Sequence, residues 1–336
     1  MNEAERHRLA RHVDTFAGRE LLVLGDLVAD AFVHGDIERV SREAPVLILR
    51  ETGRMHVPGC GGNTVMNLTA LGARPRVLGA VGRDTEGRRL KDALAESGAR
   101  VRGVVTAEAY ATPTKTRIVA GGVHTRRQQV VRIDRSEDRL PTAVAERLAL
   151  ALSRGFEKGL GLVVADYGFG AAAPSVLRAA RRATRARPPF VLVDSRQRLA
   201  EFHGVTAATP NQEELERALE LDAPLDDRSV KSAARRLFRS LGAEALCVTR
   251  GSKGMWLVTE GRAEGIPAFG PDEVADVTGA GDTVTATFAL ALASGAPYRD
   301  AAKLANVAAG LAVMKAGTAT ISPAELSQAL LDGEGA

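Results

Sequence analysis

Six short apolar segments constrain the fold of this chain more strongly than any other feature of its sequence. They are rich in Val, Leu and Ala, and polar residues do not alternate with the apolar ones inside them. Strands that are covered on both faces have this composition, because neither face meets water. The segments occupy residues 20–26, 76–82, 161–166, 190–194, 206–211 and 245–251.

Helical patterns separate most of these expected strands. They cover residues 63–71, 87–97, 143–154, 175–185, 211–220 and 229–241. Strands that alternate with helices form βαβ units, whose strands pair in parallel. The sequence therefore predicts an α/β fold with a doubly wound, mostly parallel sheet and helices on both faces. From Gly279 onwards the pattern is helical.

Two stretches interrupt the alternation, at residues 31–57 and 112–133. Both contain β-type segments without an intervening helix. We expect them to form a small antiparallel sheet that acts as a lid on a single domain spanning residues 1–336.

Composition and charge exclude several classes of protein. The chain is 45% hydrophobic and 26% charged, with a net charge of +4, which suits a globular protein with an anionic small substrate. The densest basic clusters, at 181–187 and 234–240, are typical of solvated helix faces rather than of a nucleic-acid site. Cys60 and Cys247 lie far apart, without metal-ligand spacing. No apolar run is long enough to span a membrane and no signal peptide is recognisable, so we expect a cytoplasmic protein.

A glycine turn opens the helical C-terminal part, in "GAGD" from Gly279 to Asp282. The first turn of a helix has unpaired N–H groups and a partial positive charge, and glycine lets an anion approach the backbone. A phosphate at this turn would repel Asp282 unless the carboxylate takes a proton from a hydroxyl that attacks phosphorus. The alternative is an ordinary helix start with a favourable charge in its first turn. Two other glycine-rich stretches, 58–72 and 249–258, match neither a dinucleotide-binding fingerprint nor a P-loop.

Three motifs resemble those of the ribokinase-like, or phosphofructokinase-B, family of sugar kinases. "DVTGAGDT" resembles the C-terminal signature of the family, "GCGGNTVMNLTALG" the N-terminal one, and "TPNQEE" the Asn-x-x-Glu motif. The resemblance covers roughly residues 20 to 330, in the order of the family. It implies an ATP- and Mg²⁺-dependent kinase, and it leaves open whether a monovalent cation is a further cofactor.

The resemblance also implies roles for individual residues. Asp282 would be the catalytic base, and Gly279, Ala280 and Gly281 would form an anion hole. Asn211 and Glu214 would organise the metal and the phosphates, with Glu214 acting on the metal indirectly. The nucleotide would lie along Thr249, Gly251 and Gly254, with its adenine bordered by the helix of Asn306.

Within the family, the chain is most similar to the kinases of D-glycero-D-manno-heptose 7-phosphate. "SREAPV" and "RQQVVRID" are particular to that branch. The resemblance implies transfer of the γ-phosphate of ATP to O1 of the sugar phosphate. Such kinases are often fused to a C-terminal nucleotidyltransferase, which we expect to be absent here. The alternatives are a kinase of another sugar, such as ribose, fructose or 2-keto-3-deoxygluconate, and a silent sugar-binding protein.

Several polar residues are candidates for binding the sugar phosphate. Asp26 and Asp30 can accept hydrogen bonds from sugar hydroxyls, or belong to a solvated turn. Asn63 can bind a hydroxyl, or cap a helix. A basic cluster in the lid could hold the phosphate, or be surface charge. Its members are Lys115, Arg117, Arg126, Arg127 and Arg132, and we also assign Gly59, Gly61, Gly62 and Asp166 to the sugar site.

Two positions depart from the heptose-kinase pattern. Phe169 stands where these kinases usually have Lys, and Ser195 and Arg196 replace their usual Pro-Lys. One anion contact is therefore lost or supplied from elsewhere, which affects the expected sugar but not the phosphoryl transfer.

The lid also carries an expectation about assembly. A sheet of this size is not stable alone and has an open edge, and related kinases use such lids to pair two subunits. We therefore expect a homodimer, with no nucleic-acid or membrane partner.

Overall fold

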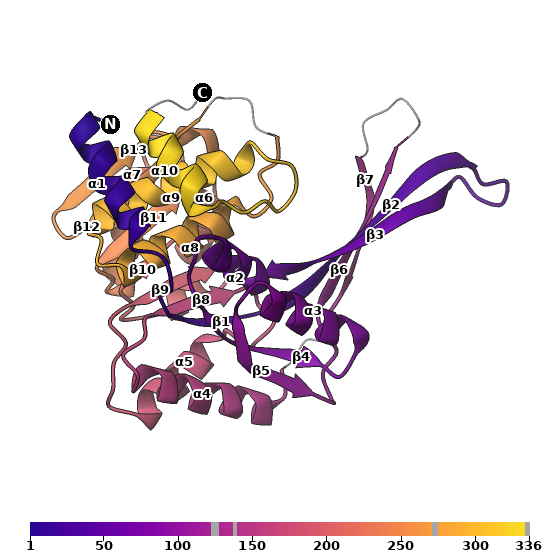
Figure 1. Cartoon of the computed structure of the whole chain (residues 1–336), viewed down its shortest axis with the longest axis horizontal. Helices are drawn as coiled ribbons and strands as arrows, with labels where there is room; N and C mark the ends of the chain where they lie inside the picture. The colour runs from indigo at the N-terminus through magenta and orange to yellow at the C-terminus, as the bar shows by residue number, and fades with distance from the viewer. Residues whose placement is uncertain (122–127, 137–139, 271–274, 333–336) are drawn as a thin grey trace.

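The computed structural model describes residues 1–121, 128–136, 140–270 and 275–332. Within these residues the strands form a nine-stranded and a four-stranded sheet. The strands of the larger sheet are β1 (Leu22–Gly25), β4 (Arg76–Gly82), β5 (Arg100–Ala107), β8 (Leu162–Asp166), β9 (Val191–Ser195), β10 (Ala207–Ala208), β11 (Ala245–Thr249), β12 (Met255–Thr259) and β13 (Arg262–Ile266). Their order is β13-β12-β11-β10-β9-β8-β1-β4-β5, and the smaller sheet projects from this body (Figure 1).

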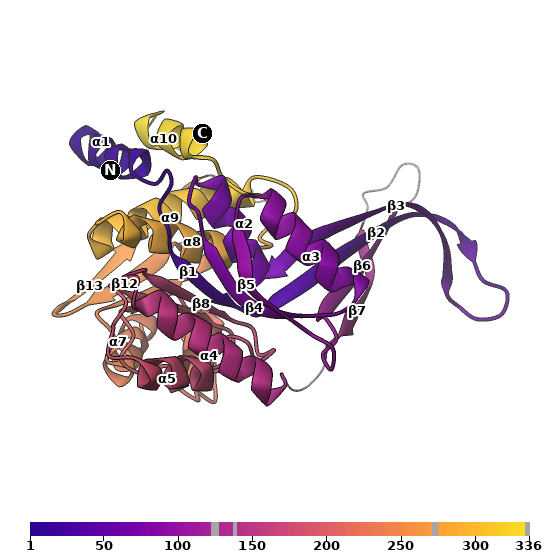
Figure 2. The same cartoon turned by 60° about the horizontal axis from the view of Figure 1, so that its bottom comes forward.

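Helices cover both faces of the larger sheet (Figure 2). One face carries α1 (Glu3–Asp14), α2 (Gly61–Ala70), α3 (Thr85–Glu96), α8 (Ala280–Ala293), α9 (Tyr298–Val313) and α10 (Pro323–Asp332). The other carries α4 (Thr142–Phe156), α5 (Pro174–Ala183), α6 (Gln212–Ala218) and α7 (Val230–Leu241). Val23 of β1 faces the first core, whereas Leu22 and Leu24 face the second. Because both of its faces are covered, a central strand such as β1 is apolar throughout.

The predicted doubly wound α/β fold is confirmed. The six predicted helices are present, and each of their ends falls within two residues of the prediction. The sequence analysis missed β5 and the β12–β13 hairpin. In this hairpin β12 pairs antiparallel with β13 on one side and with β11 on the other. Short single-turn helices, η1 (Leu199–Glu201) and η2 (Gly251–Lys253), lie in two of the loops.

The lid consists of β2 (Leu27–Val40), β3 (Leu47–Cys60), β6 (Thr114–Gly121) and β7 (Gln128–Arg135), in the order β3-β2-β6-β7. We predicted an antiparallel sheet, and this is wrong for one pair, because β2 and β6 are parallel. Both strands leave the body in the same direction: Ala29 and Thr114 are paired at its base. The chain returns to the body through β3 and then passes through β4 and β5 before it enters β6.

The helices in the described ranges are all too short or too polar to cross a lipid bilayer. The carboxyl ends of β8 to β11 lie together in the sheet, and this edge is where open α/β sheets bind ligands.

Candidate active site

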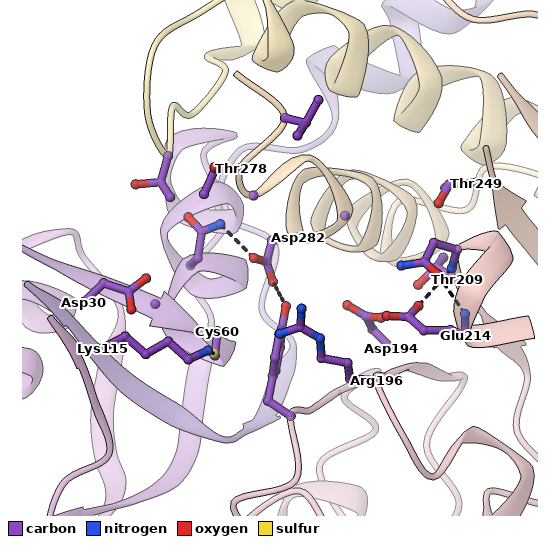
Figure 3. A pocket seen from close by; sticks show the side chains of 18 of the residues that line it. Asp30, Cys60, Lys115, Asp194, Arg196, Thr209, Glu214, Thr249, Thr278 and Asp282 are labelled. Atoms are coloured by element: carbon purple, nitrogen blue, oxygen red, sulfur yellow. Dashed lines mark hydrogen bonds between the residues drawn. The ribbon is translucent and has the colours of Figure 1, made fainter. Parts of the chain in front are cut away.

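A cavity of about 410 Å³ opens at this edge of the sheet, between the base of the lid and the start of α8. Its lining includes Asp30, Gly59, Cys60, Asn63, Lys115, Arg117, Arg132, Tyr167, Asp194, Arg196, Thr209, Asn211, Glu213, Glu214, Arg217, Thr249, Gly279, Gly281 and Asp282. Figure 3 shows Asp30 and Lys115 on one side of Asp282, and Asp194 and Glu214 on the other. The cavity therefore has a lid half and a half formed by the strand ends.

The start of α8 forms one wall of the cavity. Gly279, its N-cap, has a φ of 84°, and a Cβ there would lie 2.7 Å from Nδ2 of Asn63, so both conformation and space require glycine. A Cβ at Gly281 would meet no atom within 4 Å among the described residues, so this backbone is open to the cavity. Unpaired N–H groups at a helix start attract anions. The turn can therefore receive a phosphoryl group.

The carboxylate of Asp282 lies in the first turn of α8 and is buried. It accepts hydrogen bonds from Nδ2 of Asn63 at 2.8 Å, Oγ1 of Thr64 at 2.7 Å and the Tyr167 hydroxyl at 2.9 Å. Burial raises the pKa of Asp282, and these three donors partly oppose the rise. A carboxylate with a raised pKa, facing a cavity, is suited to accept a proton.

Asn63 does not cap a helix. The helix α2 begins at Gly61 with Cys60 as its N-cap, so Asn63 lies inside the first turn and points at Asp282. Gly61 and Gly62 are not among the lining residues, contrary to our assignment of them to the sugar site. A Cβ at Gly61 would lie 2.8 Å from Cα of Gly25, and one at Gly62 would lie 2.9 Å from Cβ of Pro58. These two glycines permit close packing behind the site.

Asp30 faces the cavity from β2. Its Oδ1 lies 3.1 Å from Nη1 of Arg117, whose guanidinium stacks 5.2 Å from the ring centre of Phe32. A Cβ at Gly59 would lie 2.5 Å from Oδ2 of Asp30, so glycine there makes room for the carboxylate. Asp30 and Gly59 thus line the cavity, where we expect the sugar to bind.

The structure does not place Asp26 or Asp166 in the cavity where we expected sugar ligands, and Asp26 does not lie in a solvated turn. Both are 1% exposed and neither lines the cavity. Asp26 accepts four backbone N–H bonds, from residues 167, 169, 171 and 172. Asp166 is paired with Arg198 and accepts a 2.7 Å bond from Oγ of Ser195. Both carboxylates are therefore used to hold loops behind the cavity.

The described part of the basic cluster reaches the cavity through Lys115, Arg117 and Arg132. Arg126 and Arg127 lie outside the described residues. Nζ of Lys115 lies 3.3 Å from Sγ of Cys60, and 5.9 Å and 6.0 Å from the ring centres of Phe169 and Tyr167. A lysine of the lid thus places its ammonium beside Phe169, the position where the heptose kinases carry their own lysine.

A second cavity, of about 170 Å³, adjoins the first and shares Thr249, Val277 and Gly281 with it. Its lining is mostly small or apolar and includes Gly251, Gly254 and Asn306, which were predicted to lie along the nucleotide, and Ala280 of the predicted anion hole. Asn306 donates a 2.8 Å bond to the carbonyl of Pro267, which holds the loop after β13 against α9. An apolar slot next to a turn that can receive a phosphoryl group fits a nucleotide base.

Asn211 and Glu214 form a capping box at the start of α6. Oδ1 of Asn211 accepts from the N–H of Glu214 at 2.8 Å, and Oε2 of Glu214 accepts from the N–H of Asn211 at 2.9 Å. Asp194, which our sequence analysis missed, lies on the same side of Asp282 as Glu214 (Figure 3). Burial and the nearby charge of Glu214 raise the pKa of Asp194 well above its ordinary value.

The region around Asp194 and Glu214 fits a divalent cation. Burial raises the pKa of both carboxylates, and the charge of Glu214 adds to the rise at Asp194, whereas Arg196 and Arg217 partly oppose the rise at Glu214. Hard oxygen ligands of this kind are what Mg²⁺ prefers. In the described residues no three His, Cys, Asp or Glu side chains converge on one point, but Mg²⁺ bound with phosphates needs only one or two protein carboxylates.

The sequence analysis missed other lining residues besides Asp194. Tyr167, Arg196 and Arg217 also line the cavity, and Thr64 contacts Asp282. For Asp194 and Tyr167 a signal was available, because each lies at or just after the carboxyl end of a predicted strand.

Comparison with known proteins identifies the family. Residues 20–325 match the pfkB family carbohydrate kinase. The chain is 40% identical over 333 residues to the bifunctional protein HldE of Paramagnetospirillum magneticum; the match covers 97% of the chain but 66% of that relative, just under two thirds.

Two solved structures share the fold. The ribokinase of Arabidopsis thaliana, complexed with ribose and ATP, has a TM-score of 0.69 at 20% identity, and covers 94% of this chain and 99% of its own. Phosphofructokinase-2 of Escherichia coli, in complex with potassium, has a TM-score of 0.74 at 20% identity, with coverages of 94% and 98%. Since the family match spans nearly the whole chain, the protein belongs to the pfkB family of carbohydrate kinases, which are phosphotransferases.

Proposed function

We propose that this chain is one kinase domain that transfers the γ-phosphate of ATP to O1 of D-glycero-D-manno-heptose 7-phosphate and gives the 1,7-bisphosphate. The observation that carries the proposal is the position of Asp282, whose buried carboxylate faces the cavity in the first turn of α8. The similarity to bifunctional protein HldE supports the heptose branch. The alternative is a related kinase acting on another sugar or sugar phosphate.

In this mechanism Asp282 accepts the proton of the sugar hydroxyl as its oxygen attacks the γ-phosphorus. The N–H groups around Gly279, Ala280 and Gly281 hold the negative charge of the transferred group. Asp30 lies on the lid side of Asp282 (Figure 3), and Asn63 contacts Asp282; both line the cavity, where they can accept from or donate to sugar hydroxyls.

The sugar phosphate would be held by cations of the lid. Lys115, Arg117 and Arg132 line the cavity from β6 and β7. Lys115 supplies a positive charge beside Phe169, which compensates for the lysine that this chain lacks there. A pre-existing phosphate at the far end of the substrate would pair with these groups.

ATP would lie across the two adjoining cavities, with its base in the slot near Asn306 and its phosphates near Gly281. Asp194 and Glu214 would hold Mg²⁺ on the phosphate side. The metal, when bound, neutralises phosphate charge. A monovalent cation as an additional cofactor remains a prediction, to which the potassium complex of the E. coli relative lends support.

We also propose a cytosolic homodimer joined through the lid. Most of the exposed large apolar side chains among the described residues are on the lid: Ile37, Val40, Val46, Leu47, Met55, Val130, Val131 and Ile133. An exposed apolar face of a small sheet marks an interaction surface.

A substrate panel with ATP tests the function. We expect kcat/KM for heptose 7-phosphate to exceed that for unphosphorylated heptose, ribose, fructose and 2-keto-3-deoxygluconate by roughly 10²-fold or more, because charge-assisted bonds to the phosphate are strong. If an unphosphorylated sugar gives the highest value, the heptose assignment is wrong and only the sugar-kinase family remains. If no sugar supports ADP release, the protein is a binder rather than a kinase.

A further inference from the structure

The two oxygens of the Asp282 carboxylate have different surroundings. Oδ1 accepts two hydrogen bonds, from Oγ1 of Thr64 at 2.7 Å and from the Tyr167 hydroxyl at 2.9 Å. Oδ2 accepts one, from Nδ2 of Asn63 at 2.8 Å. A carboxylate has about four lone-pair positions. Among the described residues, these contacts therefore leave one position open, and it is on Oδ2.

We propose that Tyr167 is a positioning residue for phosphoryl transfer: together with Thr64 it occupies Oδ1 of Asp282, so that Oδ2 takes the proton of the attacking hydroxyl. This inference rests on the proposed role of Asp282 as the base, and it does not depend on which sugar is the substrate. In the step, the O–H bond of the sugar breaks as its oxygen bonds to the γ-phosphorus. The proton moves to Oδ2, and the electron pair of the broken P–O bond leaves with ADP.

Tyr167 is a donor in this contact at any working pH. An ionised carboxylate has no proton to give, so the phenol must donate to it. Burial and the charge of Asp282 raise the pKa of Tyr167 well above its ordinary value, which keeps the hydroxyl protonated. The bond favours the ionised form of Asp282, and the Tyr167 hydroxyl accordingly lowers the pKa of that base.

A buried carboxylate behind the cavity holds Tyr167 in place. Oδ2 of Asp26 accepts the backbone N–H groups of Tyr167 and Phe169, both at 2.9 Å, and its Oδ1 accepts those of Ala171 and Ala172. Asp26 thereby fixes the loop that follows β8. Asp26, between β1 and the lid strand β2, thus supports the site although it does not reach the cavity.

Replacing Tyr167 by Phe tests the proposal, because the change removes the hydroxyl and keeps the ring. We expect kcat to fall roughly tenfold, as for the loss of one hydrogen bond to a charged group. The acid limb of the kcat profile should move to higher pH, since a base without this donor has a higher pKa and is ionised later as the pH rises. The KM for ATP should change less than twofold.

The matched control is Tyr298→Phe, which removes the hydroxyl that bonds Oε2 of Glu244 at 2.6 Å on the surface of α9. Its profile should coincide with that of the wild type. Thr64→Val removes the second donor to Oδ1 and should shift the acid limb in the same direction, which gives an independent result if Tyr167→Phe folds poorly. Thermal unfolding of each variant separates misfolding from a change in the base.

An unshifted acid limb with unchanged kcat in folded Tyr167→Phe overturns the proposal, as does an equal shift in Tyr298→Phe. The assay uses the sugar that the wild type phosphorylates best. If that sugar is not heptose 7-phosphate, the proposed substrate is wrong, while the comparison of pH profiles still decides the role of Tyr167.

Discussion

Nδ2 of Asn63 lies 2.8 Å from Oδ2 of Asp282, although 219 positions separate the two residues in the chain. The contact joins α2, which follows the lid hairpin, to the first turn of α8. A Cβ at Gly279 would lie 2.7 Å from the same Nδ2. The proposed base, the amide proposed to bind the sugar and the turn proposed to receive the phosphate therefore pack directly against one another.

Asp282→Asn should reduce turnover by roughly 10²–10⁴-fold, because the amide keeps the shape of the side chain but cannot take the proton. Nucleotide binding should be largely retained, since the slot near Asn306 is untouched. Steady-state kinetics and calorimetric titration with ATP measure the two effects. Turnover close to that of the wild type would rule out Asp282 as the base.

Lys115→Met should lower kcat/KM for a phosphorylated sugar by roughly 10- to 100-fold, because a charge-assisted bond to phosphate is lost. Any slow turnover of the unphosphorylated sugar should change little. Lys253→Met is the control, since Lys253 pairs with Asp227 on the surface. Arg127→Ala should likewise lower kcat/KM for the phosphorylated sugar and change the turnover of the unphosphorylated sugar little. Equal losses for both sugars would show that the cluster does not bind the substrate phosphate.

Val131→Glu combined with Ile133→Glu should convert a homodimer into monomers. The two side chains are 46% and 55% exposed and lie two residues apart in β7, hence on one face of the lid. Charged groups there would be desolvated in an apolar interface. Light scattering at micromolar concentration measures the molecular mass of the assembly. Leu150→Glu, at a 50% exposed position of α4, should leave it unchanged. A monomeric wild type would refute the proposed assembly.

Arg198→Met should lower the free energy of unfolding by about 3–5 kcal/mol, because it leaves the buried carboxylate of Asp166 without its partner. Exposed Arg236 serves as the control, and Arg236→Met should change stability by less than about 0.5 kcal/mol. Urea denaturation at neutral pH compares the variants. A small effect of Arg198→Met would mean that water or Ser195 suffices to stabilise Asp166.

The elements that depend on near neighbours were predictable from the sequence. Apolar runs covered on both faces, helical spacing and the glycine turn at Gly279 all follow from residues within a few positions of one another. That is why the mostly parallel sheet, the six helices that alternate with its strands, and the start of α8 were predicted. β5 and β13 were missed because these half-buried strands carry a weaker pattern. β12 is mostly buried, but its apolar run was treated as part of the glycine-rich stretch 249–258.

Pairing partners far apart in the chain were decided by the tertiary structure. Asp26 and Asp30 are the same residue type four positions apart, yet Asp30 faces the cavity while Asp26 binds the backbone of a loop 141 or more positions away. The periodicity of a strand shows which side chains share a face. It does not show which N–H donors the packing of other segments brings to those side chains. Burial of polar groups is favourable only with such partners, and the sequence alone does not show where they lie. The apolar pattern thus determined the layers and the helix that carries Asp282, whereas packing between distant segments decided which carboxylates support loops and which face the cavity.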